Sequence, residues 1–258
     1  MDTLWITELQ LLHFLFIFFR ITGILFTAPL FGEKLIPKQL RIGLALILTV
    51  ILIPVIQLNP RTASPGFILA IPLILSELLI GLILGFAANL LFTGVQLSGQ
   101  LVGYQMGFAV ANVLDPISGS QVSLFAQFET LSALMIFLCV NAHHLFIKAI
   151  VSSFRLIPPC EFHPQGGMVE KIMTMAGHMF VLAVQIGGPT IAVLIFVNVF
   201  FALMARTVPE INIFIVAMPL GIAVGLFVLG TSMPFFANLL IKTFHNLGHD
   251  LMVLMKGM

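Results

Sequence analysis

Long apolar runs separated by short polar stretches dominate the pattern of this chain. We interpret about six of these runs as helical segments, at about residues 9–30, 42–58, 67–98, 122–154, 172–205 and 211–241. A helix needs about 20 apolar residues to cross a bilayer. The second segment is therefore short, whereas the third, fourth and fifth are longer than one crossing requires. The pattern predicts an all-α membrane protein, organised as a single membrane domain over residues 1–258.

Proline and glycine fall inside several of these segments. Proline removes a helical hydrogen bond and kinks or breaks the helix that contains it. We therefore expect kinked helices and helical hairpins, some of which do not simply cross a bilayer. The expected interruptions lie at Pro54, Pro72, Gly187-Gly188-Pro189, Pro219 and Pro234.

Composition supports a membrane protein and excludes several other classes. Hydrophobic residues make up 60% of the chain and charged residues 8%, whereas soluble domains carry roughly 25% charged residues. The net charge is +1, and without an acidic or basic run nucleic acid is not an expected partner. Asp2 and Glu8 precede the first apolar run without a basic stretch, which indicates an uncleaved first helix. Cys139 and Cys160 do not form a disulfide pattern.

Lysine and arginine do not settle the orientation in the membrane. The first loop favours an N-terminus outside the cytoplasm, but the total count of basic residues opposes it. Either the segments are miscounted or the protein is not a conventional six-span bundle. Both explanations stay open at this point.

Small residues recur every four positions around residue 100, where they would form a ridge without large side chains on one helix face. Such a ridge lets two helices approach closely within a membrane. It is followed by Asp115-Pro116 and then by Ile117, Ser118 and Gly119, which together predict a flexible acidic turn. The ridge consists of Gly99, Gly103, Gly107 and Ala111.

Arg20, Glu77 and Glu129 each lie within an apolar segment. Each would cost about 2.5–3.5 kcal/mol at a bilayer centre. A proton or ion path through one of the glutamates is one interpretation. We favour structural pairing between packed helices, including an ion pair of Arg20 with one of the glutamates.

Catalytic and metal-binding patterns are weak. The adjacent His143 and His144 point about 100° apart on a helix and have no carboxylate at the right offset, so polar residues at a helix end are the better interpretation. His245 and His249 have helical spacing but no third ligand. We expect neither an enzyme nor a cofactor or metal site.

Several motifs in order along the chain resemble the FliR family of flagellar type III export gate subunits, which has counterparts in virulence injectisomes. The resemblance covers the whole chain and is specific only in combination. It is carried by Arg20, Ala28-Pro29, Ile36-Pro37, Arg41-Ile-Gly43-Leu-Ala45, Glu77, Ile80-Gly81, Gly85-Phe86, Gly103-Tyr-Gln105-Met106-Gly107-Phe108, Asp115-Pro116, Arg206-Thr-Val-Pro209-Glu-Ile-Asn212-Ile-Phe214, Met218-Pro219-Leu220 and Gly225.

This resemblance implies a non-enzymatic pore component assembled in a helical pore complex rather than a simple six-span bundle. In that family one such subunit closes a ring with FliP and FliQ subunits, which encloses a channel for unfolded export substrates. Further implied partners are FlhB, FlhA, the flagellar basal-body ring and membrane lipid. The implied location is the bacterial inner membrane, in the flagellar basal body, with the complex projecting toward the periplasm.

The family's central plug loop maps onto about Met106–Val122. We expect apolar side chains to close the pore at rest and the turn after them to allow displacement. The plug residues would be Met106, Gly107, Phe108, Val110, Val113, Leu114, Asp115, Pro116, Ile117, Ser118 and Gly119. A second ridge would pack the last hairpin against the next subunit, through Ala217, Gly221 and Gly225. Buried polar or inter-subunit contacts would come from Arg20, Glu77, Glu129, Arg206 and Asn212.

A secondary transporter of a small solute or ion is the alternative. Gly187-Gly188-Pro189 and the intramembrane Glu77 fit a binding site at a broken helix. Against it, the two halves of the chain show no convincing internal repeat.

Overall fold

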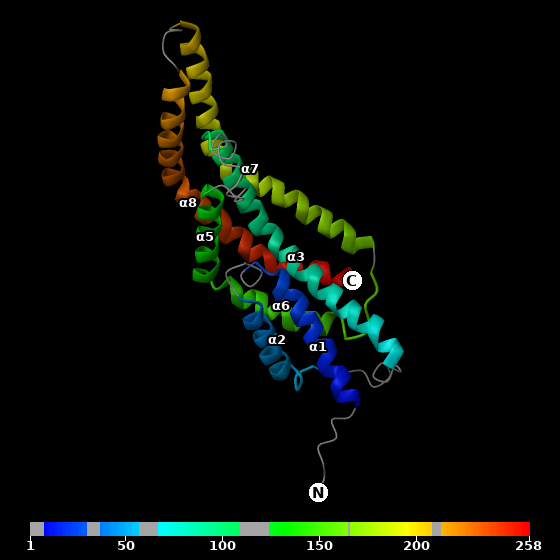
Figure 1. Cartoon of the computed structure of the whole chain (residues 1–258). Helices are drawn as coiled ribbons and strands as arrows, with labels where there is room; N and C mark the ends of the chain where they lie inside the picture. Colours follow the sequence, from blue (N-terminus) through cyan, green and yellow to red (C-terminus); the bar gives the residue numbers. More distant parts are fainter. Residues whose placement is uncertain (1–7, 30–36, 57–66, 109–123, 165, 208–212) are drawn as a thin grey trace. The chain divides into compact units, whose positions relative to one another are not determined.

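The computed structural model describes residues 8–29, 37–56, 67–108, 124–164, 166–207 and 213–258, and no strand occurs among them. This confirms the predicted all-α class. The helices follow one another along the chain as Figure 1 traces them. They are α1 (Glu8–Thr27), α2 (Lys38–Leu52), α3 (Phe67–Gln105), α5 (Leu124–Cys139), α6 (Ala142–Leu156), α7 (Gly166–Thr207) and α8 (Ile213–Lys256).

Four of the described helices are long and apolar enough to cross a membrane, and the number rises to five if α5 and α6 form one broken span. Helix α2 has 15 residues and is too short to cross alone. The fourth predicted segment is broken at Asn141, whose backbone adopts a left-handed conformation with φ 57°, and its two helices are bent by 74°. His143 and His144 lie in the first turn of α6, which confirms their assignment to a helix end.

Four of the prolines at which we expected an interruption do not end a helix. Pro72 lies inside α3, Pro189 inside α7, and both Pro219 and Pro234 inside α8. A break of the helix at any of these four positions is therefore wrong, whereas the expected kinks stay a prediction. Long helices tolerate proline in an apolar environment because neighbouring groups satisfy the freed carbonyl. Only the second segment behaves as expected, since α2 ends at Leu52, just before Pro54.

The chain divides into two compact units. Unit 1 consists of Met1–Leu90, Asn141–Met175 and His245–Met258. Unit 2 consists of Leu91–Val140 and Ala176–Phe244. Each unit has its own buried core, and the single membrane domain stays a prediction.

The core of unit 2 is apolar and partly aromatic. Phe137 packs edge-on against Phe92 and Phe244, with ring centroids 5.7 and 5.2 Å away. A second cluster contains Val102, Met106, Phe125, Leu194 and Leu229. Helices α3, α5, α7 and α8 all contribute to these two clusters, so the core joins the described helices of this unit.

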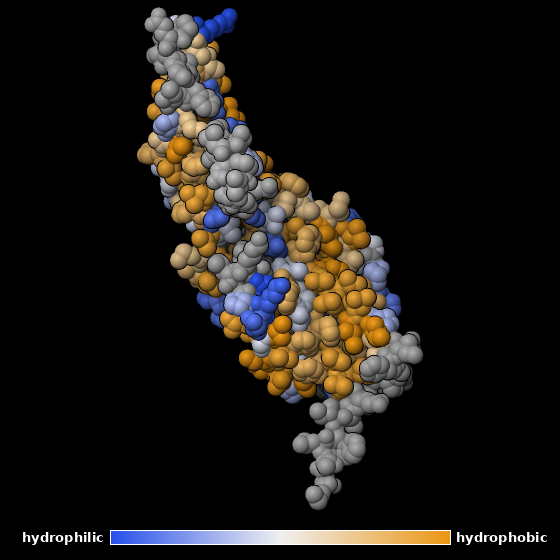
Figure 2. Space-filling view, in the orientation of Figure 1, coloured by the Kyte–Doolittle hydropathy of each residue, from blue (hydrophilic) through white to orange (hydrophobic). Residues whose placement is uncertain are grey.

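Large hydrophobic side chains also cover much of the surface, as the orange areas of Figure 2 show. Phe196 of α7 and Phe227 of α8 are 75% and 72% exposed. A soluble protein rarely exposes contiguous apolar surface of this kind. These faces must therefore meet lipid or other apolar protein surfaces.

Candidate functional site

A buried ion pair lies at the centre of unit 1. Arg20 of α1 donates from Nε to Oε2 of Glu77 of α3 over 2.6 Å, and both side chains are 0% exposed. The ion pair expected between Arg20 and one of the glutamates is thus present, and Glu77 is the partner. Because both charges are out of water, loss of either partner would leave an uncompensated charge in an apolar interior.

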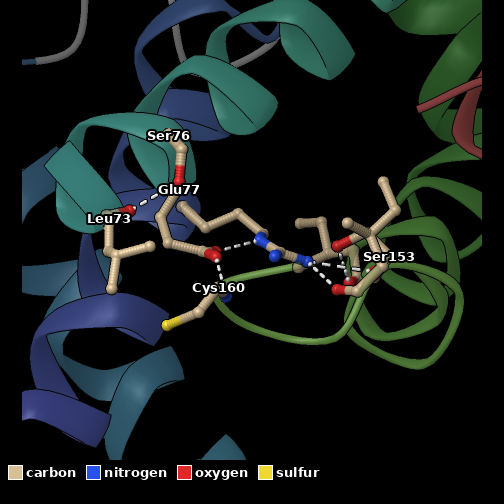
Figure 3. A network of polar contacts seen from close by, with 8 residues as sticks. Leu73, Ser76, Glu77, Ser153 and Cys160 are labelled. Atoms are coloured by element: carbon tan, nitrogen blue, oxygen red, sulfur yellow. Dashed lines mark hydrogen bonds and ion pairs between the residues drawn. The ribbon is translucent and has the colours of Figure 1, made fainter. Parts of the chain in front are cut away.

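The same two side chains hold the end of α6 and the loop after it. Nη1 of Arg20 donates to the carbonyl oxygens of Ser153 and Ile157, at 3.0 and 2.9 Å. These carbonyls belong to the negative end of the α6 dipole, which favours a nearby cation. Oε1 of Glu77 accepts a hydrogen bond from the backbone N–H of Cys160 at 3.0 Å. Figure 3 shows Glu77 facing Ser153 and Cys160 across this network.

The Arg20 guanidinium also lies over the ring of Phe154, 4.4 Å from its centroid. Arg20 and Glu77 therefore connect three helices and one loop with directional bonds. The groups are buried and positioned to fix helices in place.

Close glycine packing makes this ion pair possible. A Cβ on Gly23 would lie 2.7 Å from the carbonyl oxygen of Leu78, and a Cβ on Gly81 would collide with the carbonyl oxygen of Arg20. The same holds for Gly85, where a Cβ would lie 2.7 Å from the carbonyl oxygen of Ile24. Helices α1 and α3 thus cross with their backbones in contact.

The sequence contained a signal for this crossing that the residue-by-residue reasoning did not use. Glu77, Gly81 and Gly85 recur every four residues on α3, the same spacing that drew attention to Gly99. The signal identifies a close helix contact, whereas the partner helix follows only from the structure.

Cys160 sits in the loop that Glu77 holds, with a backbone φ of 71°. Burial and then the nearby Glu77 carboxylate raise the pKa of the Cys160 thiol to about 12. A thiol is reactive mainly as the thiolate, so Cys160 is an inert side chain at neutral pH.

The predicted helical ridge at Gly99–Ala111 is wrong at Gly107, since α3 ends at Gln105, and Ala111 lies outside the described residues. Gly107 has φ 91° and lies outside the helix. The N–H of Phe108 donates to the carbonyl of Gly103, and the N–H of Gly107 donates to that of Tyr104, both at 3.1 Å. This pattern is a Schellman motif, in which glycine supplies the left-handed residue that ends a helix. Gly107 therefore turns the chain, and it does not extend the packing face.

Gly99 does act as a packing position, because a Cβ there would meet the backbone of Ala126 in α5. Gly103 is buried on the same helix. The ridge thus serves a contact inside unit 2.

The second ridge also packs within the chain. A Cβ on Gly225 would lie 2.8 Å from Cγ of Met106, and one on Gly221 would lie 3.8 Å from the Met106 carbonyl oxygen. The expectation that Gly221 and Gly225 face a neighbouring subunit is corrected accordingly. Ala217 is half-buried, and its contact with another subunit stays a prediction.

Met106 is buried in the apolar cluster of unit 2. Its side chain fills the space that Gly225 leaves open, which favours ordinary packing for this residue over a role in closing an opening. Methionine suits such a position because its long side chain adapts to irregular gaps.

The two ends of the predicted plug loop meet. Phe108 is one of the first residues of the predicted loop and Phe125 follows the loop, and their rings are 5.0 Å apart in an edge-on contact. The remaining predicted plug, ridge and polar residues lie outside the described residues. They are Val110, Ala111, Val113, Leu114, Asp115, Pro116, Ile117, Ser118, Gly119 and Asn212.

The other predicted polar residues differ in burial. Glu129 of α5 is 4% exposed, and its Oε2 has no hydrogen-bond partner in the described part of the chain. Arg206 at the end of α7 is exposed. The prediction that it is buried within this chain is therefore wrong. Contact of Arg206 with another subunit stays a prediction.

Comparison with known proteins gives a consistent family. The model of "Bacterial export proteins, family 1" matches residues 11–247. The flagellar biosynthetic protein FliR of Bacillus subtilis is 38% identical over 219 residues, 84% of this chain and 84% of the relative. FliR of Escherichia coli is 30% identical over 239 residues, covering 91% and 90% of the two chains. FliR of Aquifex aeolicus is 31% identical and covers 88% of each. Matched over nearly its whole length, the chain belongs to family 1 of the bacterial export proteins.

Proposed function

We propose that this chain is a core component of the flagellar type III export gate. The observation that carries the proposal is the family match over residues 11–247, together with FliR relatives of closely similar length. In this role the chain forms part of the pore through which unfolded flagellar proteins are exported. Its partners would be FliP and FliQ in the ring, with FlhB, FlhA and the basal-body ring around it, in the bacterial inner membrane.

The length of the apolar helices supports a role inside a larger assembly. Residues 179–205 of α7 and 213–241 of α8 carry no charged side chain. At 1.5 Å per residue each stretch extends about 40 Å, which exceeds the hydrocarbon thickness of about 30 Å. Apolar surface beyond the bilayer needs protein neighbours, and other gate subunits would supply them.

The fixed ends of the loop after α3 support a plug at about Met106–Val122. The Schellman turn at Gly107 and the contact between Phe108 and Phe125 hold both ends of this loop together. Compact loops whose ends lie close together are frequently functional. We propose that this loop closes the pore at rest.

The transporter alternative loses one of its supports. It depended on a helix broken at Gly187-Gly188-Pro189, as binding sites of this class use discontinuous helices. Helix α7 runs through these residues from Gly166 to Thr207.

Native mass spectrometry of the tagged chain, purified with co-expressed FliP and FliQ, tests the gate assignment. The proposal predicts a large complex with one copy of this chain and several small hydrophobic subunits. A folded monomer or homo-oligomer without them would contradict it.

Deletion of residues 117–121 tests the plug separately. The proposal predicts that cells with the assembled complex then leak ions, whereas an equally long deletion at residues 61–65 does not cause the leak. An unchanged leak in an assembled 117–121 deletion would contradict the plug assignment without affecting the gate assignment.

A further inference from the structure

One face of α6 carries basic side chains that have no role in the packing of unit 1. Helix α6 buries Ala142, Phe146, Ala149, Ile150, Ser153 and Phe154. On the opposite face His144, Lys148 and Arg155 are exposed. At about 100° per residue these three positions fall within about 40° of one another around the helix axis. They form one line, which we call the basic stripe.

The basic stripe has no acidic residue close to it in the sequence. The sequence contains no aspartate or glutamate between Glu129 and Glu161. Among the described residues neither Lys148 nor Arg155 forms an ion pair or a side-chain hydrogen bond. Two permanent positive charges are therefore presented outward without an ion-pair partner in the described part of the chain.

The surroundings of the stripe are apolar, as expected for a helix at a bilayer boundary. Ile147 and Leu156 are 44% and 43% exposed beside it. The helix has 15 residues, or about 22 Å, and is too short to cross the hydrocarbon core alone. A short helix with apolar flanks and a basic stripe is typical of segments that lie in the interface of an anionic membrane.

The orientation of the stripe is fixed by the buried charges of unit 1. Arg20 donates to the carbonyl oxygens of Ser153 and Ile157 at the end of α6. Because these bonds hold the opposite face inward, Lys148 and Arg155 cannot rotate into the unit.

From this charge complementarity we propose that the basic stripe of α6 binds anionic phospholipid. Lys148 and Arg155 contact the lipid phosphates, His144 lies in the same line, and Ile147 reaches the acyl-chain boundary. Long basic side chains suit this position because their stems stay in apolar surroundings while their charged ends reach the headgroups. The binding is independent of the export role.

The test uses the full chain in nanodiscs of mixed phosphatidylcholine and phosphatidylglycerol, with retained lipids identified by native mass spectrometry. The intact chain retains phosphatidylglycerol in preference. Each basic side chain near an anionic surface contributes about fivefold in binding, so Lys148→Gln with Arg155→Gln lowers the preference by about thirtyfold. High salt weakens the preference of the intact chain in the same direction.

Lys242→Gln with Lys256→Gln is the matched control, because it removes the same charge from two exposed positions on α8. This variant keeps the lipid preference. Both double variants melt at the temperature of the intact chain in pure phosphatidylcholine, which shows that they fold.

Any of the following results would overturn the proposal. One is an undiminished phosphatidylglycerol preference in the Lys148 and Arg155 variant. Another is equal loss in the α8 control. The third is abolition of the preference by inorganic phosphate, which would indicate a free-anion site. If the variant keeps its lipid preference but loses co-expressed subunits, the stripe contacts an acidic protein surface and the lipid assignment fails.

Discussion

The two units differ in how their buried acidic side chains are bonded. In unit 1 the buried Arg20 and Glu77 bond to each other and to the backbone of α6 and the following loop, and of their side-chain atoms only Nη2 of Arg20 has no hydrogen-bond partner among the described residues. In the described part of unit 2 Glu129 is the only acidic residue, and its Oε2 has no hydrogen-bond partner there. Unit 2 is held by apolar contacts, in which Met106 fills the space beside Gly225.

This difference indicates two kinds of rigidity. Hydrogen bonds and ion pairs in a low-dielectric interior are directional and costly to break. Apolar contacts depend on fit, and a methionine side chain adjusts to small displacements. Unit 1 is therefore suited to fix helices in place, whereas unit 2, which carries the predicted plug loop, can adapt.

The largest effect is expected from removing one of the two paired charges of unit 1. Glu77→Ala leaves the buried Arg20 unpaired and should lower the free energy of unfolding by about 3–5 kcal/mol. Denaturant unfolding of the purified chain measures the change. Arg20→Met with Glu77→Leu is the control, because an apolar pair leaves no buried charge and should recover most of the loss. Equal losses in the single and double variants would contradict the ion-pair account.

The next effect concerns the crossing of α1 and α3. Gly81→Ala places a methyl group against the backbone of Arg20 and should cost about 1–3 kcal/mol through overpacking. Gly230→Ala in α8 is the control, since a Cβ there meets nothing within 4 Å, and alanine should raise helix stability by up to about 1 kcal/mol. A neutral Gly81→Ala would show that the two helices can separate freely.

A glycine-to-alanine substitution in unit 2 should lower the free energy of unfolding by less than Gly81→Ala does. Gly225→Ala meets only the side chain of Met106 among the nearest atoms, which can move, so we expect a loss of about 1 kcal/mol. Shortening Met106 to valine in the same chain should reduce that loss, which a double-mutant cycle measures. A loss larger than that of Gly81→Ala would reverse the proposed order of the two units.

Alkylation of Cys160 probes unit 1 and has the smallest expected effect on the stability of the chain. With the pKa of Cys160 raised to about 12, the thiolate is scarce at neutral pH. In a Cys139→Ser variant, alkylation of Cys160 should therefore be at least about a hundredfold slower in the folded chain than in the denatured chain. The rate should rise as pH approaches the raised pKa. Equal rates in the folded and denatured chains at neutral pH would contradict the burial of this loop.

Part of this architecture was predictable from the sequence. The cost of a lone charge in an apolar segment predicts a partner for Arg20. It does not select between Glu77 and Glu129, because each is a single acid in an apolar run. The choice depends on Gly23, Gly81 and Gly85, which bring α1 and α3 together. Which helix lies opposite a glycine is decided by tertiary packing.

Gly107 shows a second case in which the sequence alone does not decide the structure. Its spacing from Gly99 and Gly103 fits a helix face, but a glycine just after the last helical turn also ends helices. The two roles look alike in one sequence. The prolines are ambiguous for a related reason. A proline can end a helix, but Pro189 and Pro219 lie inside continuous helices. An apolar run alone does not reveal which neighbours satisfy the freed carbonyl groups.

Hydrogen–deuterium exchange of the full chain in detergent tests the central contrast most directly, because slow exchange reports on local stability. The account predicts slower exchange in α1, α6 and residues 70–90 of α3 than in residues 91–105 of α3 and in α5. In the Glu77→Ala variant, protection should fall in the first group and stay unchanged in the second. Equal or stronger protection of the second group in the intact chain would contradict the division between a charge-fixed unit and an adaptable one.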